Sequence, residues 1–235
     1  MSFRIMHGDV LHAEADALLL TLDGSKRGLE GNIARAFAKR FPDDWESIEG
    51  AVPFPIALGR IVFVRNDGDA PWHSFIIAAT LHHVDIIDDG AKLDIIRRAF
   101  REALLLCGRH AIFSLATTVL AGGWRIDAAR AFSTMKLEYQ RTSATSKPLD
   151  VLICVTDEQL ARKLCGIPSE CALSISEYYL VTDMAHKAIC DGVTSFTTGG
   201  CQFEVRVGCQ TDVPMNGSFV CETVVIVKYV LYEVT

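Results

Sequence analysis

Gly8-Asp9-Val10 closes the first apolar run of the chain, and Gly28-Leu29-Glu30-Gly31-Asn32-Ile33-Ala34-Arg35-Ala36-Phe37 follows as a glycine-bearing loop that opens a helix. An acidic side chain just past a first strand can accept hydrogen bonds from the exocyclic amine of an adenine. Backbone N–H groups at a helix start, together with the positive end of the helix dipole, can cradle a diphosphate. The two stretches together predict a site for an adenine nucleotide diphosphate. Their ordinary alternatives are a turn-capping aspartate and a simple helix cap.

Segments typical of strands and of helices alternate along the first two thirds of the chain. Strands are expected at residues 3–6, 16–22, 59–65, 74–80, 111–120 and 151–155. Helices are expected at residues 32–41, 93–107, 127–139 and 157–165, and 43–58 is expected to be a loop with a short helical turn. Pro42 is expected to stop the first helix, Gly108 to cap the end of the second, and Asp127 to cap the start of the third. The alternation predicts an α/β fold with helices on both sides of a mixed sheet, which would also suit a Rossmann-like fold.

Several of these segments share their order and spacing with one known family. They are residues 3–10, 15–23, 31–41, 58–63, 75–80 and 115–126, the last containing Ala121-Gly122-Gly123-Trp124. In this order they resemble the macro domain, the ADP-ribose-binding fold. The helix that starts near Gly31 is similar to that of the terminal ADP-ribose-protein glycohydrolase branch. The resemblance covers residues 4–164 and implies a three-layer α/β/α domain over residues 1–166.

The resemblance implies that this domain binds ADP-ribose, a related adenine nucleotide diphosphate or an ADP-ribosylated macromolecule. Asp9 would contact the adenine, and the two glycine-bearing loops would hold the phosphates. The implied ligand-binding residues are Asp9, Val10, Gly31, Asn32, Ile33, Gly122, Gly123 and Trp124. A tryptophan beside two glycines can also stack on a ribose or base. The alternative for the second loop is a tight turn between a strand and a helix, and no cofactor is expected.

The resemblance also bears on catalysis, because the family's two asparagines on the second strand fall on Leu20 and Asp23. Asp23 is expected to act as a general base or to orient a ribose hydroxyl, with a solvated turn as the alternative. Lys39 matches a basic position of the glycohydrolase branch, where a lysine attacks the anomeric carbon. Its alternative is an exposed helix lysine. Asp127 lies two residues beyond the place of that branch's catalytic acid, and a helix N-cap explains it more simply. ADP-ribosyl hydrolysis is therefore an open expectation.

Composition excludes several other classes of protein. The formal net charge of −6 argues against a direct nucleic-acid surface, which needs a basic footprint. No apolar run reaches the ~20 residues that span a bilayer, and the chain start lacks the apolar core of a signal peptide, so a cytoplasmic protein is expected. Eight cysteines without a Cys-x-x-Cys pair predict reduced thiols and no structural zinc, with Cys107 and Cys154 as core residues. Disulfides in the C-terminal third are the alternative if that part lies in an oxidising compartment.

A metal site is the alternative for the adjacent His82 and His83, which precede Asp85, Asp88 and Asp89. Imidazole and carboxylate groups are ligands for many divalent ions. Neighbouring residues of a strand point to opposite faces, however, and would chelate poorly. The three aspartates are therefore expected to form a solvated loop, and no metal is expected.

Residues 167–235 form the second predicted region, an extension of unknown type that is helical and then rich in strands. A helix is expected at 175–189, an alternating strand at 202–207, a turn at Pro214-Met215-Asn216-Gly217, and one or two strands at 219–234. This region suggests an alternative function, in which a degenerate macro domain serves as an interaction or assembly module. Its strand edges would then support a homo-oligomer. A Rossmann-like enzyme is the third candidate, although the first strand is not followed by Gly-x-Gly-x-x-Gly.

Overall fold

The computed structural model describes residues 2–28, 31–83, 86–121, 123, 125–143, 148–167, 173–191, 195–198, 201–209 and 223–230. The chain divides into two compact units, Met1–Pro168 and Ser169–Thr235. Among the described residues, no helix is both long enough and apolar enough to cross a membrane.

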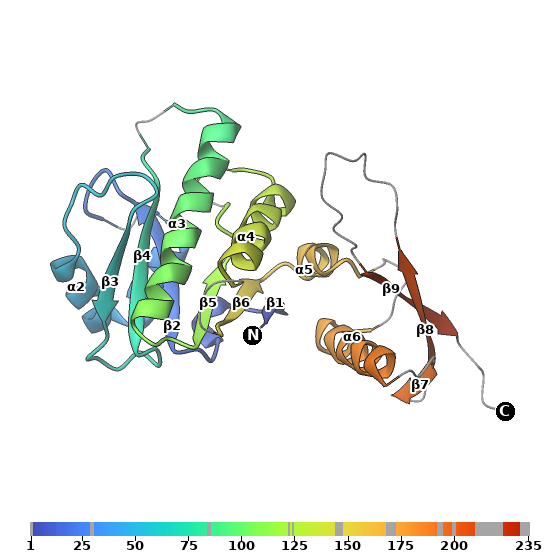
Figure 1. Ribbon diagram of the computed structural model, residues 1–235. Helices are drawn as coiled ribbons and strands as arrows, with labels where there is room; N and C mark the ends of the chain where they lie inside the picture. The colour runs from blue at the N-terminus through green and yellow to red at the C-terminus, as the bar shows by residue number, and fades with distance from the viewer. Residues whose placement is uncertain are drawn as a thin grey trace. The chain divides into compact units, whose positions relative to one another are not determined.

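The first unit is built on a six-stranded mixed sheet (Figure 1). Its strands are β1 (Phe3–His7), β2 (Ala17–Asp23), β3 (Ile61–Arg65), β4 (Ser74–Leu81), β5 (Ser114–Thr118) and β6 (Asp150–Val155). They lie in the order β1-β6-β5-β2-β4-β3. All neighbouring pairs are parallel except β3 with β4, which is antiparallel. The mixed sheet predicted from the sequence is thus confirmed.

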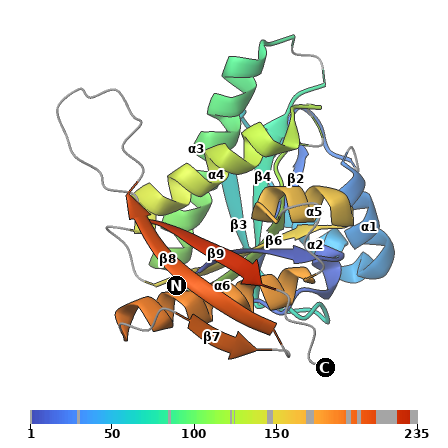
Figure 2. The same ribbon diagram turned by 90° about the vertical axis from the view of Figure 1, so that its right-hand side faces the viewer.

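Helices cover both faces of this sheet, as Figures 1 and 2 show, which completes the expected three-layer α/β/α architecture. One face carries α3 (Asp89–Arg109) and α4 (Ala128–Ser143), which pack on each other. The other carries α1 (Asn32–Arg40) and α2 (Pro42–Ala51). The short η1 (Val10–His12) follows β1, and α5 (Glu158–Cys165) contacts β1 and β6.

The central strand β2 is buried along both faces, as its continuous apolar sequence predicts. Leu18, Leu20 and Leu22 alternate into the core on the side of α1 and α2, together with Phe37 and Trp72. On the opposite side, the Phe3 ring contacts those of Phe100, Phe132 and Tyr139. Cys107 and Cys154 are buried in the core, as expected, and burial raises the pKa of each thiol to about 12.

Three local predictions differ from the structure. Residues 43–58 were expected to be mainly loop, but α2 starts at Pro42, which occupies the first helical turn. Proline is well suited to that place, because its missing N–H would have had no partner inside the helix. Gly108 does not end α3, since the helix continues to Arg109 and His110 caps it. The helix also starts earlier than expected, with Asp88 accepting a hydrogen bond from the N–H of Ala91 as N-cap.

The carboxyl ends of the five parallel strands meet at one edge of the sheet, which we call the carboxyl edge. The strands β2 and β5 are neighbours there, but the chain leaves them in opposite directions. From β2 it continues toward β3 and β4, and from β5 it returns through α4 to β6. A crevice outside the carboxyl ends of strands at such a reversal is the usual ligand site of an open α/β sheet.

The second unit contains α6 (Ile175–Cys190) and the strands β7 (Ser195–Thr198), β8 (Cys201–Cys209) and β9 (Thr223–Val230). The strands form an antiparallel sheet in the order β7-β8-β9, and α6 contacts all three. The sequence did not predict β7. The expected turn at residues 214–217 lies outside the described residues.

Candidate functional site

Asp9 stands at the carboxyl end of β1, where it is the N-cap of η1. One carboxylate oxygen accepts a hydrogen bond from the N–H of Leu11 at 3.0 Å. The other lies 3.9 Å from Nδ1 of His12, and 46% of the side chain is exposed. His12 in turn accepts a hydrogen bond from Arg40 at 2.7 Å through Nε2, because a guanidinium can only donate. Asp9 therefore presents a half-exposed carboxylate, while the side chain of its neighbour Val10 is buried.

The helix α1 begins at the carboxyl end of β2, directly behind the first glycine-bearing loop. Its N-cap is Gly31, which supplies no side-chain hydrogen bond to the first turn. A Cβ at Gly31 would lie 3.2 Å from the carbonyl oxygen of Thr21, so the loop passes close to β2. Asn32 is exposed at the helix start, and Ile33 packs against the core. The N-cap Gly31 thus makes no side-chain hydrogen bond to the first turn of α1, and an uncapped helix start is suited to binding an anion.

The second predicted loop follows β5. Of its three predicted ligand-binding residues, Gly122 and Trp124 lie outside the described residues. A Cβ at Gly123 would lie 3.3 Å from Cδ2 of Leu81, which ends β4. Asp127 accepts a hydrogen bond from the N–H of Arg130 at 2.9 Å, so it acts as the N-cap of α4, as expected. The second loop therefore reaches across to the end of β4.

Gly24 connects β2 with the first loop and is tightly enclosed. Its N–H donates to the carbonyl of Leu81 and its own carbonyl accepts from the N–H of Ile56, each at 2.8 Å. A Cβ here would lie 2.5 Å from the Ile56 carbonyl oxygen and 2.7 Å from Cβ of Ala79. Only glycine fits between these two segments, so the ends of β2 and β4 are held together at this point.

Asp23, the last residue of β2, is buried, with only 1% of its surface exposed. Oδ1 accepts hydrogen bonds from the N–H and the hydroxyl of Ser25, at 2.8 and 2.5 Å. Oδ2 accepts from the N–H of His83 at 2.9 Å and contacts its ring Nδ1 at 2.8 Å. The alternative of a solvated turn is therefore wrong, because the carboxylate is enclosed by four donors.

The electrostatics of Asp23 follow from these contacts. Burial raises the pKa of the carboxyl, but the hydrogen bonds from Ser25 and His83 outweigh it, and the pKa lies below its ordinary value. A carboxylate of low pKa whose lone pairs are already engaged is a weak proton acceptor. This geometry favours an orienting role for Asp23 over the expected role as a general base.

The sequence interpretation did not assign a role to Ser25 or to His83 beyond a metal alternative. In the structure, the two histidines contact different partners. Nε2 of His82 donates to the carbonyl of Ile56 at 2.7 Å, whereas the ring of His83 contacts Asp23. Within the part of the chain that the structure describes, no three His, Cys, Asp or Glu side chains are grouped so as to hold a metal ion. The sequence shows that His83 directly follows a buried strand, which marks it as a candidate site residue. Its contact with Asp23 could not be predicted, because that contact depends on β4 lying beside β2.

Lys39 lies in the last turn of α1 and is exposed. It is seven residues beyond Asn32, about 10 Å further along the helix axis at ~1.5 Å per residue. Its neighbour Ala38 packs against the core instead. The structure thus places Lys39 near the far end of the helix that starts at the first loop, and Asp23 at the near end.

The fold has counterparts among known protein structures. The sequence matches no protein-family profile and no curated protein. Solved structures do match. The macrodomain of Mycobacterium tuberculosis DarG is 20% identical with a TM-score of 0.53, and the match covers 65% of this chain and 97% of that one. The chain carries a macrodomain fold.

Two further macrodomains were solved with nucleotides. A mutant of the Oceanobacillus iheyensis macrodomain with ADPR is 12% identical with a TM-score of 0.59, covering 76% of this chain and 92% of that one. The Trypanosoma brucei macrodomain in complex with ADP is 13% identical with a TM-score of 0.57, covering 69% and 66% of the two chains. At these identities the matches establish the architecture alone. We refer to Met1–Pro168 as the macrodomain unit.

The sequence resemblance places the family's two asparagine positions at Leu20 and Asp23. Leu20 falls on the first of the two asparagine positions and is a core residue with 1% of its surface exposed. It offers no polar atom to a ligand. Asp23 falls on the second, and its carboxylate organises Ser25 and His83.

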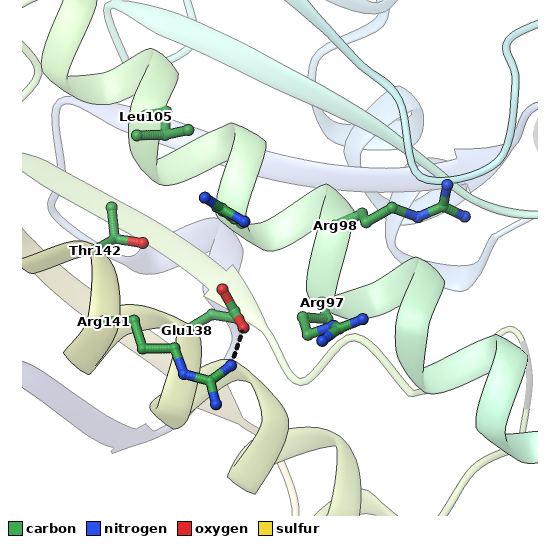
Figure 3. Close-up of a pocket in the computed structure, with 7 residues that line it drawn as sticks. Arg97, Arg98, Leu105, Glu138, Arg141 and Thr142 are labelled. Atoms are coloured by element: carbon green, nitrogen blue, oxygen red, sulfur yellow. Dashed lines mark hydrogen bonds and ion pairs between the residues drawn. The ribbon is translucent and has the colours of Figure 1, made fainter.

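A hollow of about 300 Å³ lies between α3 and α4. Figure 3 shows it as a groove lined by Arg97, Arg98, Arg101, Leu105, Glu138, Arg141 and Thr142. The buried Glu138 accepts a hydrogen bond from Arg141 at 2.9 Å, and Arg97 pairs with Asp94 at 2.9 Å. Arg98 points away from Glu138 (Figure 3). Much of the positive charge of this groove is thus neutralised by carboxylates of the same helices.

Proposed function

We propose that the macrodomain unit binds ADP-ribose or a related adenine nucleotide diphosphate at the carboxyl edge. The observation that carries the proposal is the combination of a half-exposed Asp9 carboxylate with an α1 start that Gly31 leaves without a side-chain cap. A carboxylate selects an amine such as that of adenine, and a helix N-terminus selects a phosphate. Macrodomains of the same architecture were solved with ADPR and with ADP, which supports the same ligand class here.

The strand order supports an elongated ligand. Asp9 follows β1, whereas Gly31 and Gly123 belong to the loops after β2 and β5. In the proposed mode, Asp9 takes the adenine, the amides of Gly31, Asn32 and Ile33 face one phosphate, and the second loop closes over the other. Residues 122 and 124 belong to that loop and are part of the proposal from the sequence alone.

Isothermal titration of ADP-ribose into the purified chain tests this proposal. We expect micromolar affinity, about −8 kcal/mol, with weaker binding of AMP, which lacks the second phosphate and the distal ribose. NAD serves as a further comparator. Asp9→Ala should weaken the binding of ADP-ribose at least tenfold, and Asp67→Ala, at an exposed surface carboxylate, should not. Absence of ADP-ribose binding by the wild-type chain would show the proposal to be wrong.

Hydrolysis of an ADP-ribosyl adduct is the enzymatic form of the proposal. The candidate residues from the sequence are Lys39 as nucleophile and Asp23 as the residue that acts on the ribose or the water. Turnover of an ADP-ribosylated glutamate peptide by wild type, Lys39→Ala and Asp23→Asn tests both. Turnover that is unchanged in Lys39→Ala would exclude the lysine from the reaction, in keeping with its exposed position on the last turn of α1.

The second unit supports a different candidate function, an interaction module. Among the described residues β9 pairs only with β8, and its sequence Thr223-Val224-Val225-Ile226-Val227-Lys228-Tyr229-Val230 is largely apolar. An apolar edge strand is a template for pairing with another strand, including that of a second copy of the chain. Deletion of residues 201–235 should then change the oligomeric state in light scattering while leaving the affinity for ADP-ribose unchanged. A monomeric full-length chain would argue against this function.

A further inference from the structure

The contacts of Asp23 determine which nitrogen of His83 carries the proton. Oδ2 of Asp23 lies 2.8 Å from Nδ1 of His83 and also accepts from the backbone N–H of the same residue at 2.9 Å. A carboxylate can only accept hydrogen bonds, so Nδ1 must be the donor. In the neutral ring the lone pair then resides on Nε2. With 44% of its side chain exposed, His83 is an imidazole whose tautomer is set by a buried anion while the ring remains accessible.

Ser25 is not the group that this imidazole activates. Its hydroxyl lies 3.0 Å from Nδ1 of His83, the nitrogen that faces Asp23, and donates to Oδ1 of Asp23 at 2.5 Å. A serine nucleophile would instead have to lie against the nitrogen that carries the lone pair. Ser25 therefore completes the enclosure of the carboxylate, and among the described residues none is hydrogen-bonded to Nε2 of His83.

His83 lies at the carboxyl edge beside both loops that we assign to the diphosphate. It comes two residues after Leu81, which accepts from the N–H of Gly24 and lies against Gly123. Asp9 follows β1, and β4 is four strands away from β1 in the sheet. At ~4.8 Å per strand, this separation is about 19 Å, which places His83 far along the carboxyl edge from the proposed adenine contact.

We propose that His83 is a general base at the carboxyl edge and that Asp23 is the residue that positions it. This inference rests on the proposed function, because it acts on the distal ribose of a bound ADP-ribosyl ester. Water attacks the anomeric carbon, and Nε2 of His83 accepts one proton of that water. A bond forms between the water oxygen and the anomeric carbon, while the bond from that carbon to the ester oxygen breaks. The carboxylate leaves with its electron pair, and the imidazolium, stabilised by Asp23, later returns its proton to solvent.

Turnover and affinity measured on the same variants test the proposal. His83→Ala should lower kcat for an ADP-ribosylated glutamate peptide about 100-fold, the usual contribution of a general base, and should leave the Kd for ADP-ribose within about threefold. The matched control is His73→Ala, an exposed histidine at the other end of β4, which should change neither quantity. Unchanged turnover in His83→Ala, or a wild type that binds ADP-ribose without hydrolysing the peptide, would overturn the assignment but not the proposed function. Loss of ADP-ribose binding by the wild type would overturn both.

The ring tautomer supplies a readout that a purely structural role would not require. Two-bond ¹⁵N–¹H correlation spectra of the histidine-labelled chain, with the His83 signals assigned by their loss in His83→Ala, should show Nδ1 protonated in the neutral ring. Asp23→Asn should shift His83 toward the Nε2–H form and lower kcat. A wild-type His83 in the Nε2–H form would show that its lone pair faces Asp23 and would overturn the proposal.

Discussion

Asp9 and Asp23 each follow a strand of the same sheet, yet the structure gives them different tasks. Asp9 lies at the carboxyl end of β1, and 46% of its side chain is exposed. One of its carboxylate oxygens accepts a hydrogen bond from the backbone N–H of Leu11. Asp23 has no exposed side-chain surface and accepts from Ser25 and His83 through both oxygens. The same side chain therefore remains half-exposed in one place and organises other protein groups in the other.

The difference arises from the neighbours of each strand. The strand β1 is at the border of the sheet, and the chain turns outward after it into the short η1. The strand β2 lies between β5 and β4, so the residues after β4 close over its end. Position in the sheet thus decides whether a carboxylate at a strand end remains accessible.

The largest expected effect concerns stability. Asp23→Ala leaves the partly buried donors of Ser25 and His83 without an acceptor and should lower the free energy of unfolding by about 3 kcal/mol. Asp9→Ala removes a half-exposed cap and should cost about 1 kcal/mol. Urea unfolding of the two variants and wild type measures both. Equal losses would mean that the two carboxylates do not differ in the way the structure indicates.

Gly24 sharpens the comparison because it holds the ends of β2 and β4 together. Gly24→Ala places a methyl group 2.5 Å from the carbonyl oxygen of Ile56 and should lower the free energy of unfolding by about 2 kcal/mol. The matched control is Gly50→Ala in α2, where nothing lies within 4 Å of the new Cβ. That change should leave stability unchanged or raise it by up to about 1 kcal/mol. Thermal unfolding gives both values, and a neutral Gly24→Ala would contradict the tight junction.

The affinity for ADP-ribose distinguishes the structural role of Asp9, as the cap of η1, from its proposed role as the adenine contact. Asp9→Asn keeps an oxygen for the N–H of Leu11 but presents an NH₂ group, which cannot accept from an adenine amine. We therefore expect near wild-type stability and at least a tenfold rise in the Kd for ADP-ribose, about 1.4 kcal/mol. Titration calorimetry with unfolding controls measures the pair of values. Unchanged affinity would remove Asp9 from the binding site.

The smallest expected effect is a dependence of the free energy of unfolding on pH in the acidic range. The pKa of Asp23 is lowered in the folded state, because its hydrogen bonds to Ser25 and His83 outweigh the effect of burial. The folded state then binds the proton less readily than the unfolded state, whose pKa is about 3.9. The stabilisation is present above that pH and is lost as the pH falls through the folded pKa. The stability difference between wild type and Asp23→Asn should therefore shrink below about pH 4 in urea titrations, and a constant difference would contradict the lowered pKa.

Much of the architecture was predictable from local patterns. The continuous apolar run of β2 indicates a strand buried on both faces, and the apolar positions of α3 indicate a helix with one face in the core. Pro42 was misleading, because proline both ends one helix and starts the next, and the sequence alone does not show which role it takes. Asp127 illustrates the opposite case, since its cap depends only on the three residues that follow it.

Some features of the candidate site could likewise be predicted from local sequence, and others could not. The sequence by itself determined the alternation of strands and helices, the placing of Asp9 and Gly31 at element ends, and the resemblance to a macrodomain. Only the tertiary structure brought His83 to Asp23, 60 positions apart, because that contact requires β4 to lie beside β2. It also decided that Leu20 faces the core and Lys39 the solvent. Local patterns are set by neighbours in the chain, whereas the partner of a strand-end side chain is set by the order of strands, which no local pattern contains.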